Sequence, residues 1–157
     1  MKPLVDRIVA ERGTVLHLYQ MLLQSPAVAK GWLSYLTAIR QQTSLSGALR
    51  ELVIMRVAEL NGAPYEADQH APIALKEGVT QQQLDALREW KASDAFSALE
   101  RAVLAYTDAM TRQIQVPDDV FATVQKHLSA AHLVELTATV AAYNMVSRFL
   151  LALGIQH

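Results

Sequence analysis

The amino-acid sequence predicts an all-α fold of about eight helices packed in two or three layers. Apolar residues recur three and four positions apart through most of the chain, a spacing that places them on one face of a helix. No segment alternates apolar and polar residues for long enough to indicate a strand. The length of 157 residues suits a single domain over residues 1–157 with one core.

Five helices are predicted in the first half of the chain. Pro26 and Pro64 suit the first turns of two of them, and Gly13 suits the end of the first helix. Ser44 or Ser46 is available as the N-cap of the fourth helix, which places Arg56 on an otherwise apolar stripe. The predicted segments are residues 1–12, 15–23, 26–40, 49–60 and 64–77.

The second half of the chain continues the same pattern. Thr80 and Gln83 have the spacing of a capping box, and Pro117 is followed by two aspartates that suit the positive end of a helix. Ser129 is the expected cap of the last helix, which Gly154 ends. The predicted segments are residues 84–90, 95–113, 117–128 and 130–153.

The last predicted helix is apolar almost all round, which raises the question of a membrane span. Glu135, Asn144 and Arg148 interrupt it, so a central packed helix or an oligomer interface is the better interpretation. Hydrophobic residues make up 52% of the chain and charged residues 18%. This leaves few polar residues for the surface of a monomer. We expect a homo-oligomer, with a thick α-helical core as the alternative.

Charge and cysteine content exclude several classes of function. There are 14 basic and 15 acidic residues and no run of like charge, so neither nucleic acid nor a membrane surface is an expected partner. The absence of cysteine removes disulfides, thiolate nucleophiles and cysteine metal sites. His17, His127 and His132 lack acidic partners at ligand spacing, and no metal is expected. Asp6 and Glu11 interrupt the apolar positions of the N-terminal segment, which predicts a cytoplasmic protein without a signal peptide.

The ionisable residues with the most suggestive spacing are Glu66 and His70. They lie four apart on one predicted helix and can hydrogen-bond across one turn. Such a bond fixes the tautomer of the imidazole and raises its basicity if the pair is partly buried, which prepares a general acid or base. An ordinary surface Glu–His pair is the alternative, because this spacing is common on helices.

Three further residues are weighed in the same way. Glu51 lies among apolar neighbours, where its pKa would be raised for proton transfer, or it pairs on the surface with Arg50 or Arg56. Asn144 and Arg148 share a helix face and could bind a substrate carboxylate, or they pack against Glu135 or another acid.

The run from Arg50 to Ala71 resembles the core of the carboxymuconolactone decarboxylase family, which belongs with the alkyl hydroperoxidase D-like proteins. The shared pattern is a glutamate, a C-x-x-C pair that begins twelve residues later, and a histidine four residues after the second cysteine. Glu51, Ala63, Glu66 and His70 match that spacing. The resemblance implies an alkyl hydroperoxidase D-like helical bundle that forms trimers or hexamers. Because Ala63 and Glu66 replace the cysteines, dithiol peroxidase chemistry is not expected.

The resemblance implies cofactor-free acid/base chemistry on a small lactone or oxo acid, as in the branch that decarboxylates a muconolactone in aromatic catabolism. His70 is the implied general acid/base, Glu66 its orienter or a second acid, and Glu51 a relay or a substrate-facing carboxylate. Arg148, Asn144 and Tyr65 are the candidate substrate-binding residues. The competing hypothesis is a non-catalytic oligomeric binding or stress-associated protein on the same scaffold, which predicts a shallow or solvent-flooded site.

Overall fold

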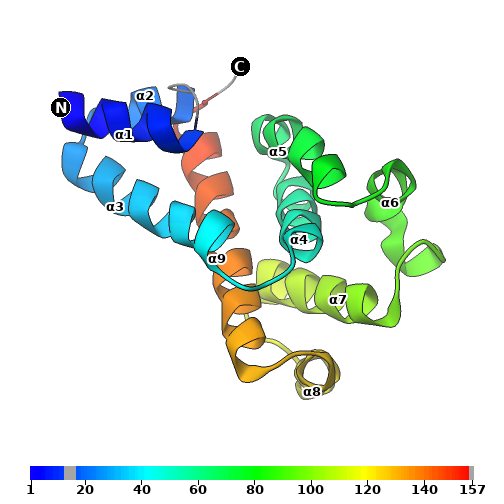
Figure 1. The fold of residues 1–157 in the computed structure, drawn as a ribbon. Helices are drawn as coiled ribbons and strands as arrows, with labels where there is room; N and C mark the ends of the chain where they lie inside the picture. The colour runs from blue at the N-terminus through cyan, green and yellow to red at the C-terminus, as the bar shows by residue number, and fades with distance from the viewer. Residues whose placement is uncertain (13–16, 156–157) are drawn as a thin grey trace.

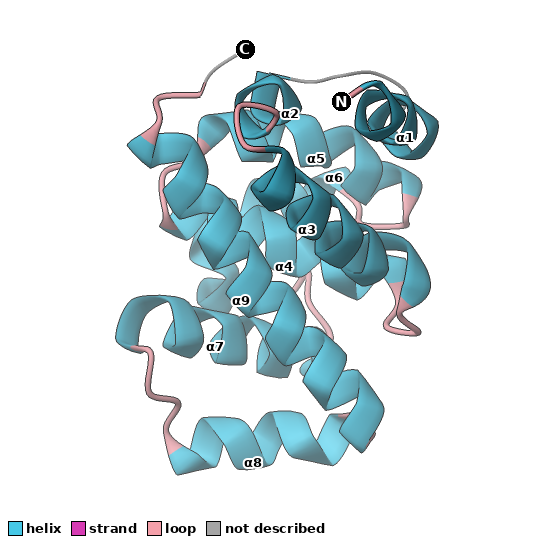
Figure 2. Ribbon diagram, turned by 90° about the vertical axis from the view of Figure 1, so that its left-hand side faces the viewer, coloured by secondary structure: helices cyan, strands magenta, loops and turns pink. Residues whose placement is uncertain are grey.

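The computed structural model describes residues 1–12 and 17–155 and confirms the all-α class. Over these residues the chain forms helices and loops without a strand (Figure 2). The end of the first helix at Gly13 and the start of the predicted 15–23 helix lie outside the described residues. The described α-helices are α1 Lys2–Arg12, α2 His17–Leu22, α3 Pro26–Thr37, α4 Gly47–Leu60, α5 Pro64–Lys76, α6 Gln81–Ala86, α7 Ala98–Gln113, α8 Asp118–His127 and α9 Ala130–Ala152.

Side-chain caps start four of these helices. Ser46 accepts a hydrogen bond from the Leu49 amide, and Ser129 accepts one from the His132 amide. Thr80 begins a complete capping box, as its spacing predicts. Ser97 begins a second capping box, so α7 starts at Ala98 and not at residue 95. The predicted start at residue 95 was wrong because the Ser97–Glu100 capping box satisfies the first amides of the helix and fixes its start at Ala98.

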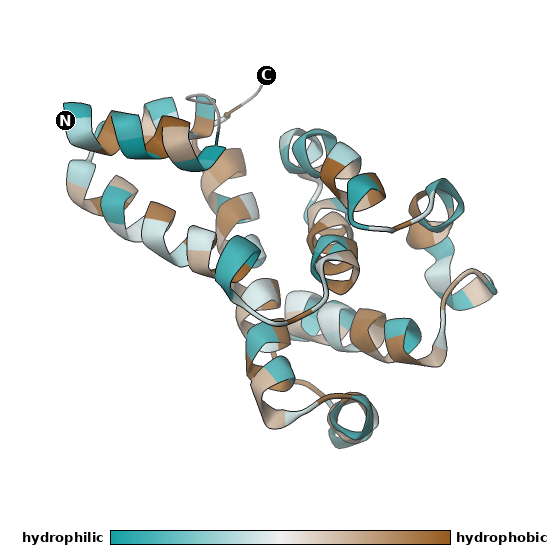
Figure 3. Cartoon of the chain, viewed as in Figure 1, coloured by the Kyte–Doolittle hydropathy of each residue, from teal (hydrophilic) through white to brown (hydrophobic). Residues whose placement is uncertain are grey.

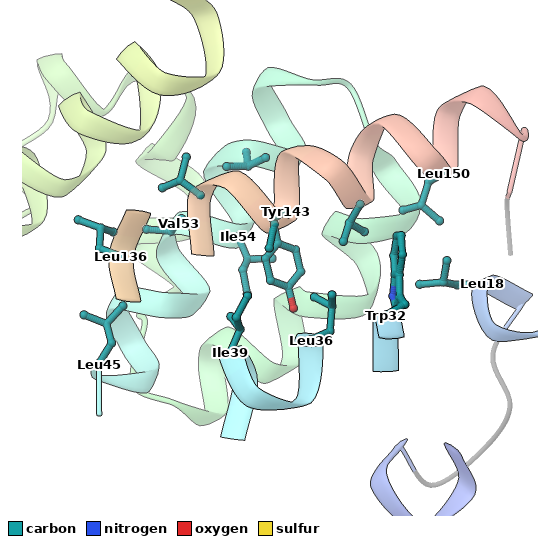
Figure 4. Close-up of a cluster of buried hydrophobic side chains, with 14 of the residues drawn as sticks. Leu18, Trp32, Leu36, Ile39, Leu45, Val53, Ile54, Leu136, Tyr143 and Leu150 are labelled. Atoms are coloured by element: carbon teal, nitrogen blue, oxygen red, sulfur yellow. The ribbon is translucent and has the colours of Figure 1, made fainter. Parts of the chain in front are cut away.

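The helix α4 lies at the centre of the fold. It packs against α5, α7 and α9, and Figure 1 shows α1 and α3 on the other side of α9 from α4 and α5. Most helices carry both hydrophobic and hydrophilic residues (Figure 3), in line with one buried face. The main core lies between α3, α4 and α9, where Leu36, Ile39, Val53, Ile54 and Leu136 are buried (Figure 4).

The segment predicted as one helix over residues 26–40 changes form near its end. The α-helix α3 stops at Thr37, and Ala38–Gln42 forms a π-helical turn. Such turns are rare and occur often at functional sites. The guanidinium of Arg50 donates to the Arg40 carbonyl oxygen at 2.8 Å, which fixes the π turn against the start of α4.

The last helix is packed, as predicted. Its residues Leu136, Val140, Tyr143, Val146 and Leu150 are buried. Within the described part of the chain, no helix combines the length and the apolar character needed to cross a membrane.

A buried ion pair joins α4 to α7. Arg56, on the apolar stripe of α4, donates from Nε and Nη2 to the two carboxylate oxygens of Asp108 at 2.7 and 2.9 Å. Trp90, in the 3₁₀-helical turn Leu87–Ala92, donates to the same carboxylate at 3.1 Å. The apolar stripe of α4 can therefore stay buried, because the guanidinium of Arg56 is paired with a carboxylate.

Replacing Asp108 with alanine is expected to destabilise the fold by roughly 3–5 kcal/mol, since it leaves Arg56 and the Trp90 indole N–H with unpaired buried donors. Urea unfolding measures the change. Asp94→Ala removes an exposed aspartate and is the control, with an expected change within about 0.5 kcal/mol. Equal stability of both variants would contradict a structural role for the ion pair.

Candidate active site

The candidate active site is a histidine held between two carboxylates. His70 of α5 lies with its Nδ1 2.7 Å from Oε1 of Glu51, on α4. Its Nε2 lies 3.0 Å from Oε1 of Glu66, one turn earlier on α5. All three residues are buried, with exposed fractions of 0% for Glu51, 4% for Glu66 and 5% for His70. Glu51 therefore contacts His70 directly, and the surface Glu–His alternative is excluded.

Local sequence explains how each carboxylate reaches the imidazole. Pro64 starts α5 directly after the short connection from α4, so the two helices are antiparallel neighbours. Glu66 then lies in the first turn of α5, where the positive end of the helix dipole favours a carboxylate. His70 follows one turn later on the same face, and the packing of α5 against α4 brings it to Glu51.

The two carboxylates favour the charged form of the imidazole. Burial lowers the pKa of His70, but hydrogen bonds and charge interactions with Glu51 and Glu66 raise it to about 9. Burial raises the pKa of Glu51, but its bonds to His70 and Arg50 outweigh this and leave the pKa below its usual value. Because a carboxylate faces each ring nitrogen, both nitrogens donate hydrogen bonds in the imidazolium form.

Arg50 pairs with Glu51 through the carboxylate oxygen that does not contact His70. Its Nε donates to Glu51 Oε2 at 2.8 Å, so Glu51 has one oxygen on His70 and the other on Arg50. Nη2 of the same guanidinium lies 3.5 Å from a Glu77 oxygen. The sequence left Arg50 or Arg56 as the possible ion-pair partner of Glu51. In the structure Arg50 is the partner, whereas Arg56 pairs with Asp108 and Glu59.

The His70–Glu66 pair faces a cavity of about 390 Å³. That size suits a small organic molecule. The cavity combines an apolar wall with several polar and charged groups. Its lining residues are Glu11, Arg12, Leu18, Tyr19, Trp32, Leu36, Arg40, Tyr65, Glu66, Gln69, His70, Ile73, Tyr143 and Val146. Glu51 does not line it, because His70 lies between Glu51 and the cavity.

Tyr143 of α9 forms part of the cavity wall beside the histidine. Its ring meets the His70 ring edge-on, with centroids 5.4 Å apart and an interplanar angle of 83°. It extends from α9 toward Leu36 of α3 (Figure 4). Burial and the nearby carboxylates raise its pKa far above the ordinary value, so the hydroxyl stays protonated and can donate a hydrogen bond.

The structure does not bring Arg148 and Asn144 to this cavity. Arg148 is exposed and donates to the carbonyl and side-chain oxygens of Asn144 at 3.1 and 2.9 Å. Asn144 also bonds to Asn61 and Thr111, which ties α9 to the residue that follows α4 and to α7. Neither residue lines the cavity, and among residues 1–12 and 17–155 neither forms an ion pair with an acid, so their role as substrate ligands stays a prediction. Tyr65 does line it.

Three cavity residues were missed as site residues in the sequence. Tyr143 lies on the last helix, and its place beside His70 depends on how α9 packs. Arg12 and Arg40 reach the cavity from the end of α1 and from the π turn. Their positions depend on long-range packing, so no local spacing indicated them.

No group of three or more metal-binding side chains arranged for a metal ion occurs among residues 1–12 and 17–155. Within the Glu51–His70–Glu66 set, Nδ1 of His70 is hydrogen-bonded to Glu51, and Nε2 lies 3.0 Å from a Glu66 carboxylate oxygen.

Fold and site together define an all-α protein of the alkyl hydroperoxidase D-like kind with a carboxylate–histidine pair in place of a dithiol. The chain belongs to the carboxymuconolactone decarboxylase family: the sequence profile of that family matches residues 26–109. This stretch contains Arg40, Glu51, Glu66 and His70, which confirms the resemblance seen in the sequence.

Two bacterial relatives are similar to the chain in sequence. The uncharacterized protein YdfG of Bacillus subtilis (strain 168) is 30% identical over 116 residues, which cover 73% of this chain and 79% of YdfG. The uncharacterized protein YnjA of Escherichia coli (strain K12) is 29% identical over 126 residues, which cover 80% of this chain and 66% of YnjA.

Solved structures share the fold. ATU0492 of Agrobacterium tumefaciens, a protein of unknown function, superposes with a TM-score of 0.82 at 25% identity, covering 87% of this chain and 94% of that one. The debrominase Bmp8 superposes with a TM-score of 0.83 at 20% identity, covering 99% of this chain and 84% of Bmp8. An uncharacterized peroxidase-related protein of Ralstonia eutropha JMP134 with an alkylhydroperoxidase AhpD core superposes with a TM-score of 0.83 at 16% identity. The match covers 97% of this chain and 82% of that one.

The raised pKa of His70 predicts a pH dependence of stability. The folded value of about 9 lies above the unfolded value of about 6.5, so the contribution is complete below pH about 6.5 and is lost as the pH rises through about 9. We expect the wild type to lose up to roughly 3 kcal/mol of unfolding free energy over this interval that His70→Gln does not lose.

Urea unfolding at pH 6, 7.5 and 9.5 measures this difference. His127→Gln changes an exposed histidine on α8 and is expected to keep the wild-type dependence. Parallel curves for the wild type and His70→Gln would show that His70 is not charged in the folded protein at neutral pH.

Proposed function

We propose that this protein is a cofactor-free enzyme that moves a proton on or off carbon in a small lactone or oxo acid, by decarboxylation or a related step. The observation that supports this most is the buried Glu51–His70–Glu66 set at the wall of a cavity. Proton transfer at carbon requires an acid or base of tuned pKa, shielded from water and within reach of the substrate.

The geometry favours Glu66 as the group that exchanges a proton with the substrate. Both ring nitrogens of His70 are bonded to carboxylates, so His70 reaches a substrate most directly through Glu66. In this proposal Glu66 is the general acid/base, His70 is its proton partner, and Glu51 with Arg50 holds the imidazolium in place. This refines the roles drawn from the resemblance, in which His70 itself acted on the substrate.

A decarboxylation at this site balances as follows. The bond between the substrate carbon and its carboxylate breaks, carbon dioxide leaves, and the electron pair passes into the adjacent carbonyl to give an enolate. The Tyr143 hydroxyl, which stays protonated, is placed in the cavity to donate to the enolate oxygen. The Nε2 proton of the His70 imidazolium passes to the Glu66 carboxylate, Glu66 delivers it to the substrate carbon, and a proton from solvent restores the imidazolium.

The enclosure of the pair supports an enzyme over a non-catalytic binding protein. A scaffold that had lost its chemistry would have no need to keep two buried carboxylates and an imidazole, because buried charges are costly unless they are paired. The predicted mark of the non-catalytic alternative was a shallow or solvent-flooded site, whereas Glu66 and His70 are only 4% and 5% exposed. Thiol peroxidase chemistry remains excluded, since the chain has no cysteine.

Self-association into a trimer or hexamer is part of the proposal. The packed helix α9 still exposes Val134, Met145 and Leu151 by 68%, 39% and 50%. These exposed apolar side chains, together with the composition of the chain, favour an interface between copies.

Turnover of 4-carboxymuconolactone, followed by ultraviolet absorbance, tests the function. Where the wild type turns over, His70→Ala and Glu66→Gln are each expected to lower kcat by at least about 100-fold. Glu89→Gln, which changes an exposed glutamate, is the matched control and is expected to retain activity. If the wild type does not turn over 4-carboxymuconolactone, the same variants are assayed with a panel of other lactones and oxo acids.

Full activity in His70→Ala or Glu66→Gln would overturn the assignment of the site. An inactive wild type on the whole panel would favour the non-catalytic alternative.

A further inference from the structure

Two arginines line the cavity that the Glu66–His70 pair faces, and we propose that they form an anion subsite. Arg12 ends α1 and Arg40 lies in the π turn. In this proposal Arg12 and Arg40 bind a carboxylate of the substrate and so hold its carbon skeleton against Glu66. The inference rests on the proposed function for its chemistry, but it concerns binding and is tested without turnover.

Arg12 has donors that the described protein does not use. Its Nε and Nη2 are buried without a hydrogen-bond partner among the described residues. Nη1 makes a long bond of 3.3 Å to the Glu11 carbonyl, and the guanidinium lies over the Tyr19 ring at 5.8 Å. Buried charged donors without acceptors are costly, so an acceptor supplied by a ligand explains this arrangement.

Arg40 is held in place through its backbone. Its carbonyl oxygen accepts the bond from Arg50, while its guanidinium makes no hydrogen bond or ion pair with the described parts of the chain. Arg40 is also close enough to Tyr143 for its charge to act on that hydroxyl. Arg50 therefore bonds both to the π turn, which positions Arg40, and to Glu51, which positions His70.

The other inward-facing arginines of the described chain are used differently. Arg50 and Arg56 bind carboxylates of the protein, and Arg101 donates to the carbonyls of Trp90, Lys91 and Ser93. Those guanidinium groups hold the fold together. Arg12 and Arg40 share only one such bond, that of Arg12 to a neighbouring carbonyl, and both line the same cavity.

A carboxylate on a small, partly apolar skeleton fits this cavity best. Guanidinium groups match the two oxygens of a carboxylate, and Trp32, Leu36 and Val146 supply an apolar wall. Glu66 and Glu11 also line the cavity, and Glu11 is already bonded to Arg7 and Thr37. The cations that remain for a ligand are therefore Arg12 and Arg40.

Two-dimensional ¹H–¹⁵N spectra of the labelled protein test the subsite. The probes are benzoate and 2-oxoglutarate, with benzamide as the neutral counterpart of benzoate. The indole signal of Trp32, in the cavity wall, is expected to shift with the carboxylates, whereas that of Trp90, which donates to Asp108 outside the cavity, does not. Benzamide is expected to bind at least about tenfold more weakly than benzoate.

Substitutions separate the two arginines from general effects of charge. Arg12→Gln and Arg40→Gln are each expected to weaken benzoate binding about tenfold and to leave benzamide binding unchanged. Arg40→Lys, which keeps the charge, is expected to fall between. Arg88→Gln removes an exposed arginine outside the cavity and is the matched control. Circular dichroism checks that each variant is folded.

Equal binding of benzoate and benzamide, unchanged affinity in both glutamine variants, or no shift with either carboxylate would overturn the subsite. Carboxylate binding that depends on both arginines, in a protein without turnover, would keep the subsite and remove the proposed enzyme function. Turnover of a lactone that neither Arg12→Gln nor Arg40→Gln weakens would keep the proposed enzyme function and remove the subsite.

Discussion

The rest of the site depends on the hydrogen bond between Glu51 and His70. It joins α4 to α5 at 2.7 Å in a place where Glu51 has no exposed surface. A carboxylate in such a place is stable only with partners on its oxygens, and it has two, His70 and Arg50. The contact therefore sets the orientation of the imidazole, and with it the direction in which Nε2 meets Glu66.

Charge balance explains why three ionised groups can share this interior. The imidazolium lies between two carboxylates, and the guanidinium of Arg50 lies on the far oxygen of the inner one. Each charge thus has an opposite neighbour within hydrogen-bond distance. The inner carboxylate, with partners on both oxygens, is fixed as the structural member of the set. The outer one, Glu66, borders the cavity and is the member that can react.

Local sequence was enough to predict most of the fold and part of the site. Helix type follows from periodicity, and the Ser/Thr caps and prolines mark most boundaries because they act within one turn. Glu66 and His70 pair across one turn of one helix, so their spacing alone predicts the contact. Their burial and the direct contact with Glu51 depend on how α5 packs on α4, and only the resemblance to a family indicated that Glu51 belonged with them.

The candidate residues that do not line the cavity, and the cavity residues that local sequence missed, depend on longer-range geometry. Arg148 and Asn144 share a face of α9, but the packing of α9 turns that face toward Asn61 and Thr111. Tyr143, the residue directly before Asn144, points into the site instead. Arg40 lies in a π turn, where i→i+5 bonding does not keep the register of the α-helix, and Arg12 reaches the cavity only through the packing of α1.

The replacement of a cysteine by Glu66 changes the chemistry while it keeps the proton partner. A thiolate at this position would be activated as a nucleophile by the nearby imidazolium. A carboxylate in the same place forms an ion pair with the imidazolium, 3.0 Å from Nε2, cannot take part in thiol–disulfide exchange, and can exchange protons with a carbon acid. The same two-helix frame, with Glu51 behind the histidine, would then serve redox chemistry when a cysteine faces the cavity and proton transfer when a glutamate does.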